Sequence, residues 1–197
     1  MCHLNIKLIY LFTDPLKRTE ADNIQAAWSD LRYEPSEAEL KTAAQLAQEG
    51  YLSSVKNMQI ENKNISEIST DNMSKLASIL TDTVYITNIT PVSQLGTILA
   101  SVQSELLWLG HVSLSEENTQ ALVTAMRTRV QTVAVWSGLT LDPELLSAYD
   151  GQGHCNKLVV MGRNKREKYG TRLKRWARDR GWTVTKDSDE FLKIERT

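Results

Sequence analysis

Short segments in which two apolar residues flank a third residue recur along the chain at nearly constant intervals. Each segment alternates with period two and several are rich in β-branched residues, as short strands are. The six segments are Met58–Ile60, Val84–Ile86, Leu107–Leu109, Val133–Val135, Leu158–Val160 and Trp182–Val184. Their spacing of about 25 residues indicates an internal repeat.

Between consecutive strands, apolar residues recur three and four positions apart, which is the spacing of one helix face. The predicted stripes are Met73, Leu76, Ala77 and Leu80; Leu95, Ile98, Leu99 and Val102; Leu122, Ala125 and Met126; Leu145, Leu146 and Tyr149; and Tyr169, Leu173, Trp176 and Ala177. Ser115 and the pair Asp142-Pro143 are typical of helix N-termini, and Gly181 is typical of a helix end. A strand and a helix therefore alternate along most of the chain.

This alternation is compatible with a doubly wound sheet or with a solenoid. Doubly wound proteins have longer, almost uniformly apolar strands and a glycine-rich turn after the first strand. The strands and helices predicted here are short, and that turn is absent. The period also falls within the roughly 20 to 29 residues of leucine-rich repeats. We therefore predict an α/β solenoid of about five or six repeats, with a curved parallel sheet and short helices on the convex side.

The strand cores resemble the L-x-x-L-x-L pattern of irregular leucine-rich repeats. The segments that match best are Val55–Ile60, Val130–Val135 and Cys155–Val160. Over residues 36–197 the sequence is similar to the ribonuclease-inhibitor-type repeats of NOD-like receptors and related fish proteins. The resemblance implies protein recognition in an innate-immune or regulatory setting.

The chain departs from this family pattern at two positions of the repeat. The first apolar position of the core is occupied by Thr81, Ser104 and Asp179 in three units. The family asparagine, three residues after the last apolar position, is replaced by Lys63, Ile89, Val112, Gly138 and Arg163. Backbone groups in these turns must then find other partners, so we expect irregular repeats.

Both ends of the chain have patterns typical of caps, which a solenoid needs to cover its terminal repeats. Two helix stripes flank Glu34-Pro35, namely Ile24, Ala27, Trp28 and Leu31, then Leu40, Ala43, Ala44 and Ala47. At the other end, Trp182–Thr185 and Phe191–Glu195 predict a hairpin whose second strand covers the final edge. We therefore expect one domain over 1–197, with a helical N-terminal cap over 1–50, repeats over 51–186 and a C-terminal cap over 187–197.

The predicted sheet face that points away from the helices is our candidate binding surface. Two columns of side chains lie on it: Gln59, Tyr85, Trp108, Ala134, Val159 and Thr183, and Glu61, Thr87, Gly110, Trp136, Met161 and Thr185. Aromatic residues are enriched at interface hot spots. The candidate partner-binding residues are Tyr85, Trp108, Trp136, Met161, Gln59 and Glu61. The alternative is that these side chains pack on one another or under a flanking loop.

A basic segment over 163–180 contrasts with the rest of the chain. It holds nine Lys or Arg residues against Glu167 and Asp179, whereas the whole chain has a net charge of −1. Such a segment could bind nucleic acid or an anionic membrane surface. Its apolar residues form one stripe, however, which favours charges on the solvated side of a helix and disfavours nucleic-acid binding.

The sequence contains no known catalytic motif, and its histidines are scattered, so we expect neither enzymatic activity nor a cofactor. His111 lies in a predicted strand, where a structural role is usual. Cys2-His3 and His154-Cys155 could supply zinc ligands, but adjacent residues chelate poorly, and Cys155 fits a small core position. No metal site is therefore predicted.

The two cysteines are far apart in sequence, which favours a reducing compartment. The apolar run 4–12 is too short for a membrane span and lacks the features of a signal peptide. We therefore expect a cytoplasmic, non-enzymatic protein-interaction module. The alternative is a structural repeat region of a larger receptor.

Overall fold

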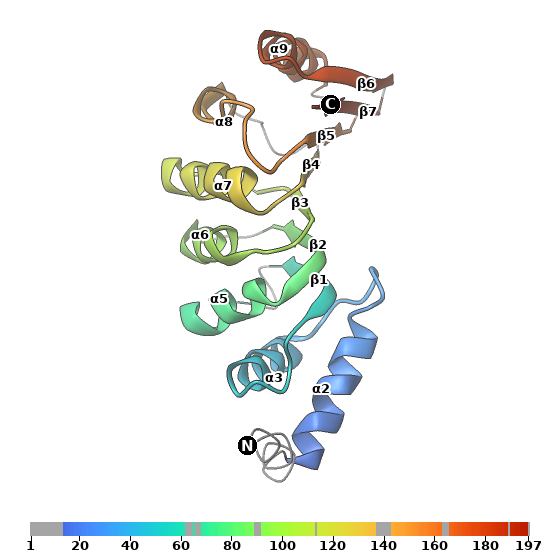
Figure 1. The fold of residues 1–197 in the computed structure, drawn as a ribbon, viewed down its shortest axis with the longest axis vertical. Helices are drawn as coiled ribbons and strands as arrows, with labels where there is room; N and C mark the ends of the chain where they lie inside the picture. Colours follow the sequence, from blue (N-terminus) through green and yellow to red (C-terminus); the bar gives the residue numbers. More distant parts are fainter. Residues whose placement is uncertain are drawn as a thin grey trace, which may run out of the picture.

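The computed structural model describes residues 14–61, 65, 68–88, 92–112, 114–136, 143–162, 166–188 and 190–196. These residues form an α/β structure with one open, mostly parallel sheet (Figure 1). The strands are β1 Val55–Glu61, β2 Leu80–Thr87, β3 Leu106–Gly110, β4 Thr132–Trp136, β5 Lys157–Met161, β6 Thr183–Ser188 and β7 Phe191–Glu195. The helices are α2 Pro15–Ala27, α3 Glu37–Gln48, α5 Thr70–Ser78, α6 Val92–Ser101, α7 Glu116–Thr128, α8 Pro143–Ala148 and α9 Arg166–Asp179.

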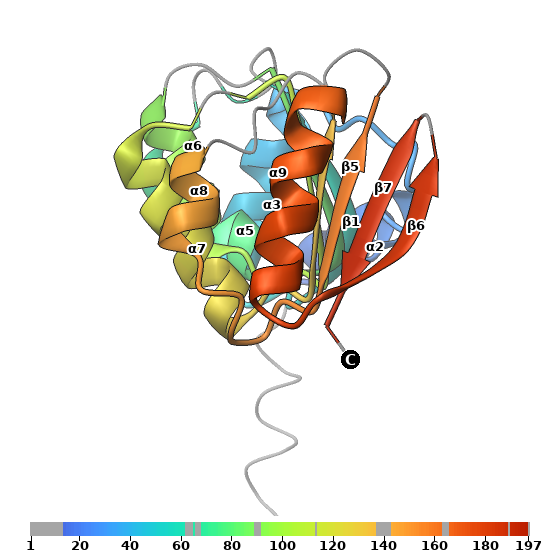
Figure 2. The same cartoon turned by 90° about the horizontal axis from the view of Figure 1, so that it is seen from above.

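The strand order is β1-β2-β3-β4-β5-β7-β6, and the first five strands are parallel neighbours in sequence order. Parallel crossovers are almost always right-handed, so a strand order that never reverses places each crossover helix on the same face. Figure 2 shows α5 to α9 together on one side of the sheet. In Figure 1 the stack bends with these helices on its outer side. The predicted alternation and parallel order are therefore confirmed for β1 to β5.

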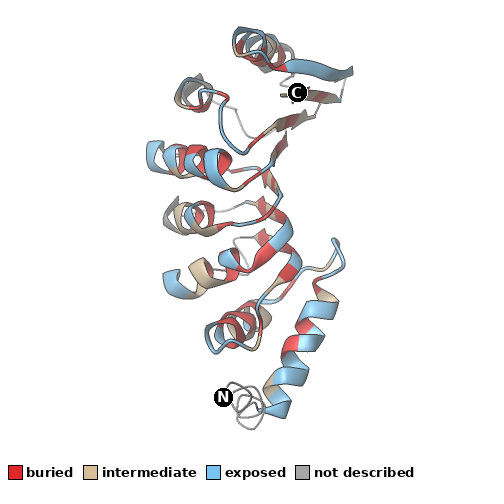
Figure 3. Cartoon of the chain, viewed as in Figure 1, coloured by how far each residue is buried: buried red, intermediate tan, exposed pale blue. Residues whose placement is uncertain are grey.

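The core lies between the sheet and these helices, where the buried residues concentrate in Figure 3. The strand residues that face the helices are at most 2% exposed: Met58, Ile60, Val84, Ile86, Leu107, Leu109, Val133, Val135 and Leu158. Burial of one such side chain stabilises the fold by roughly 1.5–3 kcal/mol. Five of the six predicted apolar segments therefore act as core strands of the parallel stack.

The predicted helix stripes are also buried wherever their side chains are described. The buried members are Met73, Leu76, Ala77, Leu95, Ile98, Leu99, Leu122, Ala125, Met126, Leu145, Leu173, Trp176 and Ala177. Ser115 begins α7 as predicted, because its side chain accepts a hydrogen bond from the Asn118 N–H at 3.2 Å. Three stripes were drawn too long, since Leu80 is already in β2, Val102 follows α6 and Tyr149 follows α8. Asp142 and the side chains of Leu146 and Tyr169 lie outside the described residues.

The sixth predicted segment does not join the parallel stack beside β5. The antiparallel strand β7 lies between β5 and β6, so the predicted hairpin forms but β6, not its second strand, is the final edge. Burial explains this order. Leu192 and Ile194 of β7 are fully buried, whereas every residue of β6 is exposed, including Val184 at 39%. The strand with two apolar residues facing the core therefore takes the inner position.

The first sheet edge is covered by the segment that follows α2. The Asn57 N–H donates to the Trp28 carbonyl at 3.0 Å, and the Asn57 side-chain amide donates to the Ser29 carbonyl at 3.0 Å. The predicted stripe on the first helix is too long, because α2 ends at Ala27 and Leu31 is 50% exposed. Edge coverage of this kind blocks pairing with another chain.

A left-handed residue recurs two positions after the last apolar residue of a predicted core segment. Asn88, His111 and Gly162 follow β2, β3 and β5 at this position, with φ of 53°, 50° and 106°. Glycine, asparagine and histidine are enriched at positive φ. The recurring turn residue is thus one position earlier than the family asparagine that we looked for. His111 lies just after β3 and is exposed, so its prediction as a strand residue is wrong.

No helix in the described ranges combines the length and the apolar character that crossing a lipid bilayer requires.

Substitution at the left-handed turn should separate backbone strain from side-chain loss. We expect His111→Val to lower the free energy of unfolding by about 1–2 kcal/mol, because a β-branched residue resists positive φ. His111→Gly removes the same imidazole and should change it by less than about 1 kcal/mol. Urea denaturation checks both values. Equal stability of the two variants would show that the turn carries no strain.

Candidate functional site

The face of the sheet opposite the crossover helices carries the predicted site residues. Strand register aligns one set of them directly: Gln59 with Tyr85, Tyr85 with Trp108, Trp108 with Ala134, and Ala134 with Val159. Side chains two residues further along each strand lie on the same face. Both predicted columns are therefore present across β1 to β5.

Three aromatic side chains of this face contact one another. The ring centroids of Tyr85 and Trp108 are 5.4 Å apart, and those of Trp108 and Trp136 are 6.2 Å apart, with interplanar angles of 35° and 31°. Tyr85 and Trp108 are partly exposed, and Trp136 is 39% exposed. The rings thus pack on one another, as our alternative expected, and still present surface to solvent.

Two small residues make room for these rings. Ala134 pairs directly with Trp108 and is only 2% exposed although no crossover helix covers its face. At Gly110, an added Cβ would lie 3.2 Å from Thr87 Cγ2 and 3.8 Å from Trp136 Cβ. Large and small residues therefore alternate, which lets the indole rings lie close to the sheet.

The row continues onto the C-terminal hairpin. Met161 pairs with Trp136 on one side and with Phe191 on the other. Phe191 is partly exposed, and the Lys186 Nζ lies 4.8 Å from its ring centroid. We name Tyr85, Trp108, Trp136, Met161 and Phe191 the aromatic row. Sequence reasoning missed Phe191 because its strand was assigned to a cap, although its alternation with Leu192 predicts which face it occupies.

Gln59 and Glu61 lie at the β1 end of this row and interact with each other. The Gln59 amide donates to Glu61 Oε1 at 3.2 Å and to Glu34 Oε1 at 3.4 Å. The Thr87 hydroxyl donates to Glu61 Oε1 at 3.2 Å. These residues therefore form a polar, acidic boundary at the β1 end of the face.

The opposite end of the face is basic. Lys157 and Lys193 both approach the Glu195 carboxylate, at 3.5 and 2.8 Å. The hydrogen bond from Lys193 is the main cause of a lowered pKa at Glu195. Together with Lys186 these residues leave an excess of positive charge over β5, β7 and β6. The face thus runs from acidic at β1 to basic at the hairpin.

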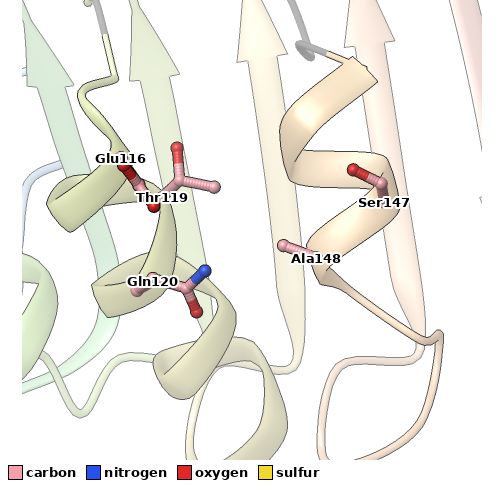
Figure 4. A pocket seen from close by; sticks show the side chains of 5 residues that line it. All are labelled: Glu116, Thr119, Gln120, Ser147 and Ala148. Atoms are coloured by element: carbon pink, nitrogen blue, oxygen red, sulfur yellow. The ribbon is translucent and has the colours of Figure 1, made fainter.

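The helix side carries a cavity of about 390 Å³ between α7 and α8 (Figure 4). Its lining residues are Glu116, Thr119, Gln120, Ser147 and Ala148. They offer one carboxylate, two hydroxyls and one amide.

Cys155 occupies the core, as predicted. It is fully buried, and burial raises the pKa of its thiol to about 11. The Tyr149 hydroxyl donates to the Cys155 carbonyl at 3.2 Å, and burial raises the pKa of that hydroxyl too. Within the described ranges, no group of three or more His, Cys, Asp and Glu residues could hold a metal ion. Cys2 and His3 lie outside those ranges.

The loop that contains Gly151 and Gly153 bonds to residues on either side of the C-terminal hairpin. The Trp182 indole N–H and the Arg196 guanidinium donate to the Gly151 carbonyl at 3.1 and 2.8 Å, and Arg196 also donates to the Gly153 carbonyl. Both glycines have positive φ, of 81° and 112°. This loop therefore has a structural role.

The basic segment is amphipathic where its side chains are described. Leu173, Trp176 and Ala177 are buried, whereas Arg172, Arg175 and Arg178 are exposed. Lys174 is paired with Asp187 of β6. Residues 163–165 and the side chains of 166–169 lie outside the described residues. In the rest of the segment, the charges occupy the solvated side of α9, as we predicted.

Comparisons with protein-family models, with curated proteins and with solved structures give no match for this chain. The resemblance of its strand cores to leucine-rich repeats therefore stays a prediction.

Substitution of Gly153 should destabilise the fold strongly. A Cβ at this position would lie 2.5 Å from the Arg127 Cα and 2.7 Å from the Arg127 carbonyl oxygen. We expect Gly153→Ala to lower the free energy of unfolding by more than about 3 kcal/mol. Gly181→Ala is the matched control, because Gly181 has a φ of +72° and open space around it. It should lose only about 1–2 kcal/mol. Urea denaturation of both variants decides, and similar losses would disprove the steric argument.

Burial of the Cys155 thiol predicts a specific alkaline instability. Its pKa is raised from 9.0 to about 11, so the folded state keeps the proton longer than the unfolded state. The resulting stabilisation is complete below pH 9 and is lost as pH rises to about 11. Over this interval the native chain should lose about 2–3 kcal/mol more unfolding free energy than Cys155→Ala. Parallel pH profiles of the two proteins would contradict this prediction.

Proposed function

We propose that the chain is a leucine-rich-repeat-like solenoid that binds another protein through the sheet face opposite its crossover helices. The observation that carries this proposal is the aromatic row, a line of neighbouring, at least partly exposed side chains over β2, β3, β4, β5 and β7, in which Trp108 contacts Tyr85 and Trp136. The function is recognition, without catalysis or a cofactor.

The order of the elements supports the solenoid part of the proposal. Five parallel strands follow one another in sequence order, each crossover helix lies on the same side, and the strands recur about every 25 residues. A solenoid built this way keeps one sheet face free along its length, and repeat proteins use such faces for binding.

The chemistry of the face supports recognition of a protein. Tyrosine and tryptophan are the residue types most enriched at interface hot spots, because each buries a large apolar area and can also donate a hydrogen bond. Their contacts with one another restrict the rings before a partner arrives, which lowers the entropic cost of binding.

The biological setting rests on the family resemblance alone. It suggests a cytoplasmic protein of innate-immune or regulatory signalling, as the repeat regions of NOD-like receptors are. The alternative is a structural repeat region of a larger receptor, in which the same sheet face would pack against another domain of that polypeptide.

A second candidate function is binding of nucleic acid or an anionic surface through α9. Arg172, Arg175 and Arg178 are exposed on this helix at a spacing of three residues. Phosphate contacts by such residues would give binding that weakens steeply with salt. The triple alanine variant of these arginines separates this candidate from binding by the sheet face.

The proposal predicts that loss of two indoles removes partner binding. We expect Trp108→Ala with Trp136→Ala to weaken capture of the partner by at least about 2 kcal/mol, or roughly 30-fold. Quantitative pull-down from source tissue measures this effect, and circular dichroism confirms that the variant is folded.

The matched control is Gln120→Ala with Thr124→Ala, two exposed positions on the outer side of α7. This control should retain the partner fully. If the folded double tryptophan variant captures the same proteins as the native chain, the sheet face is not the binding site.

A further inference from the structure

The aromatic row offers hydrogen-bond donors that no described residue uses. The Tyr85 hydroxyl and the indole N–H groups of Trp108 and Trp136 have no hydrogen-bond partner within the described part of the chain. An indole nitrogen can only donate. A ligand that fits this row should therefore present acceptors at regular intervals and cover apolar rings at the same time.

The spacing of the rings limits the shape of such a ligand. The centroids lie 5.4 and 6.2 Å apart. A polyproline II segment rises about 3.1 Å per residue, so every second residue lies about 6.2 Å further along. The roughly 5.4 Å pitch of an α-helix would also match these distances. Spacing alone does not distinguish the two.

Hydrogen bonding distinguishes a polyproline II segment from an α-helix as the ligand. The carbonyls within an α-helix are already bonded to its own N–H groups, so they have little need of external donors. A polyproline II segment has no internal hydrogen bonds, and its proline residues bring acceptors without donors. Proline rings also dock well against aromatic side chains. The free donors and the rings together favour the extended segment.

The charges at the two ends of the row indicate the flanks of this segment. Glu34 and Glu61 lie at the β1 end, and Lys157, Lys186 and Lys193 lie at the hairpin end. Five strand spacings separate β1 from β7, or about 24 Å, which about eight polyproline II residues span.

We infer that the aromatic row binds an extended proline-rich segment of a partner protein, about eight residues long, with a basic flank over β1 and an acidic flank over β7. The inference deepens the proposed function and rests on it, because both assign binding to the same face.

The test uses the full chain and a synthetic peptide of two arginines, eight prolines and two glutamates. Nitrogen-15 NMR resolves the indole N–H signals of the five tryptophans. Trp108 and Trp136 should shift during the titration, whereas the buried Trp28, Trp176 and Trp182 serve as internal references. If the two row signals do not shift, or if all five shift alike, the inference is wrong.

Two further peptides test the chemistry of the core and of the flanks. Replacing the eight prolines by alanines keeps the charges and should weaken binding at least about tenfold, since the extended shape and the ring contacts are lost. Replacing the two arginines by glutamates should weaken it about two- to fivefold, because one flank then meets like charge. Equal or tighter binding of the alanine peptide would favour a helical ligand and overturn the inference.

A variant of the protein tests whether the peptide binds at the aromatic row. Trp108→Ala should weaken binding of the proline peptide at least about tenfold, and Gln120→Ala on α7 should leave it unchanged. The result is separable from the test of the proposed function. If the double tryptophan variant loses its natural partner while the proline peptide fails to bind the native chain, the sheet face still binds a protein but the ligand is not proline-rich.

Discussion

The right-handedness of parallel crossovers is the constraint on which this architecture depends. Strands β1 to β5 are added in one direction, so each crossover helix falls on the same face of the sheet. Most of the buried apolar side chains of β1 to β5 and of these helices then gather in one layer between that face and the helices. On the opposite face, Ala134 and Val159 are buried, whereas Gln59, Tyr85, Trp108 and Trp136 are at least partly exposed. This exposure is the physical reason for seeking a binding surface on the face opposite the helices.

A stack that grows in one direction leaves core exposed at both of its ends. At the first end, the segment after α2 pairs with β1 through Trp28 and Asn57. At the last end, the antiparallel strand β7 takes the position where a sixth parallel strand would stand, and Arg196 then bonds to the loop of Gly151 and Gly153. An antiparallel neighbour changes the hydrogen-bond pattern of the ladder, so no further parallel repeat continues from it in the same register.

Much of the fold could be predicted because burial imposes a period on the sequence. Alternation marked the strands, and helical spacing marked α5, α6 and α7, since those residues must all face one layer. The position of β7 could not be read this way, because periodicity reports which face a residue occupies and not which strand lies beside it. The turn residues were misplaced for a related reason. Asn88 and His111 are set by backbone φ, which leaves no apolar pattern.

The candidate site, too, could be predicted only in part from the sequence. The alternation of residues along each strand predicts that Tyr85, Trp108 and Trp136 lie on one face of the sheet. Only the strand register shows that small residues beside them let the rings meet, and that Phe191 extends the aromatic row. Packing of the rings on one another was considered an alternative to binding. The two are compatible, because side chains that already hold each other in place lose less conformational freedom when a ligand covers them. Mutual packing of the rings is therefore consistent with the binding role that we propose for this face.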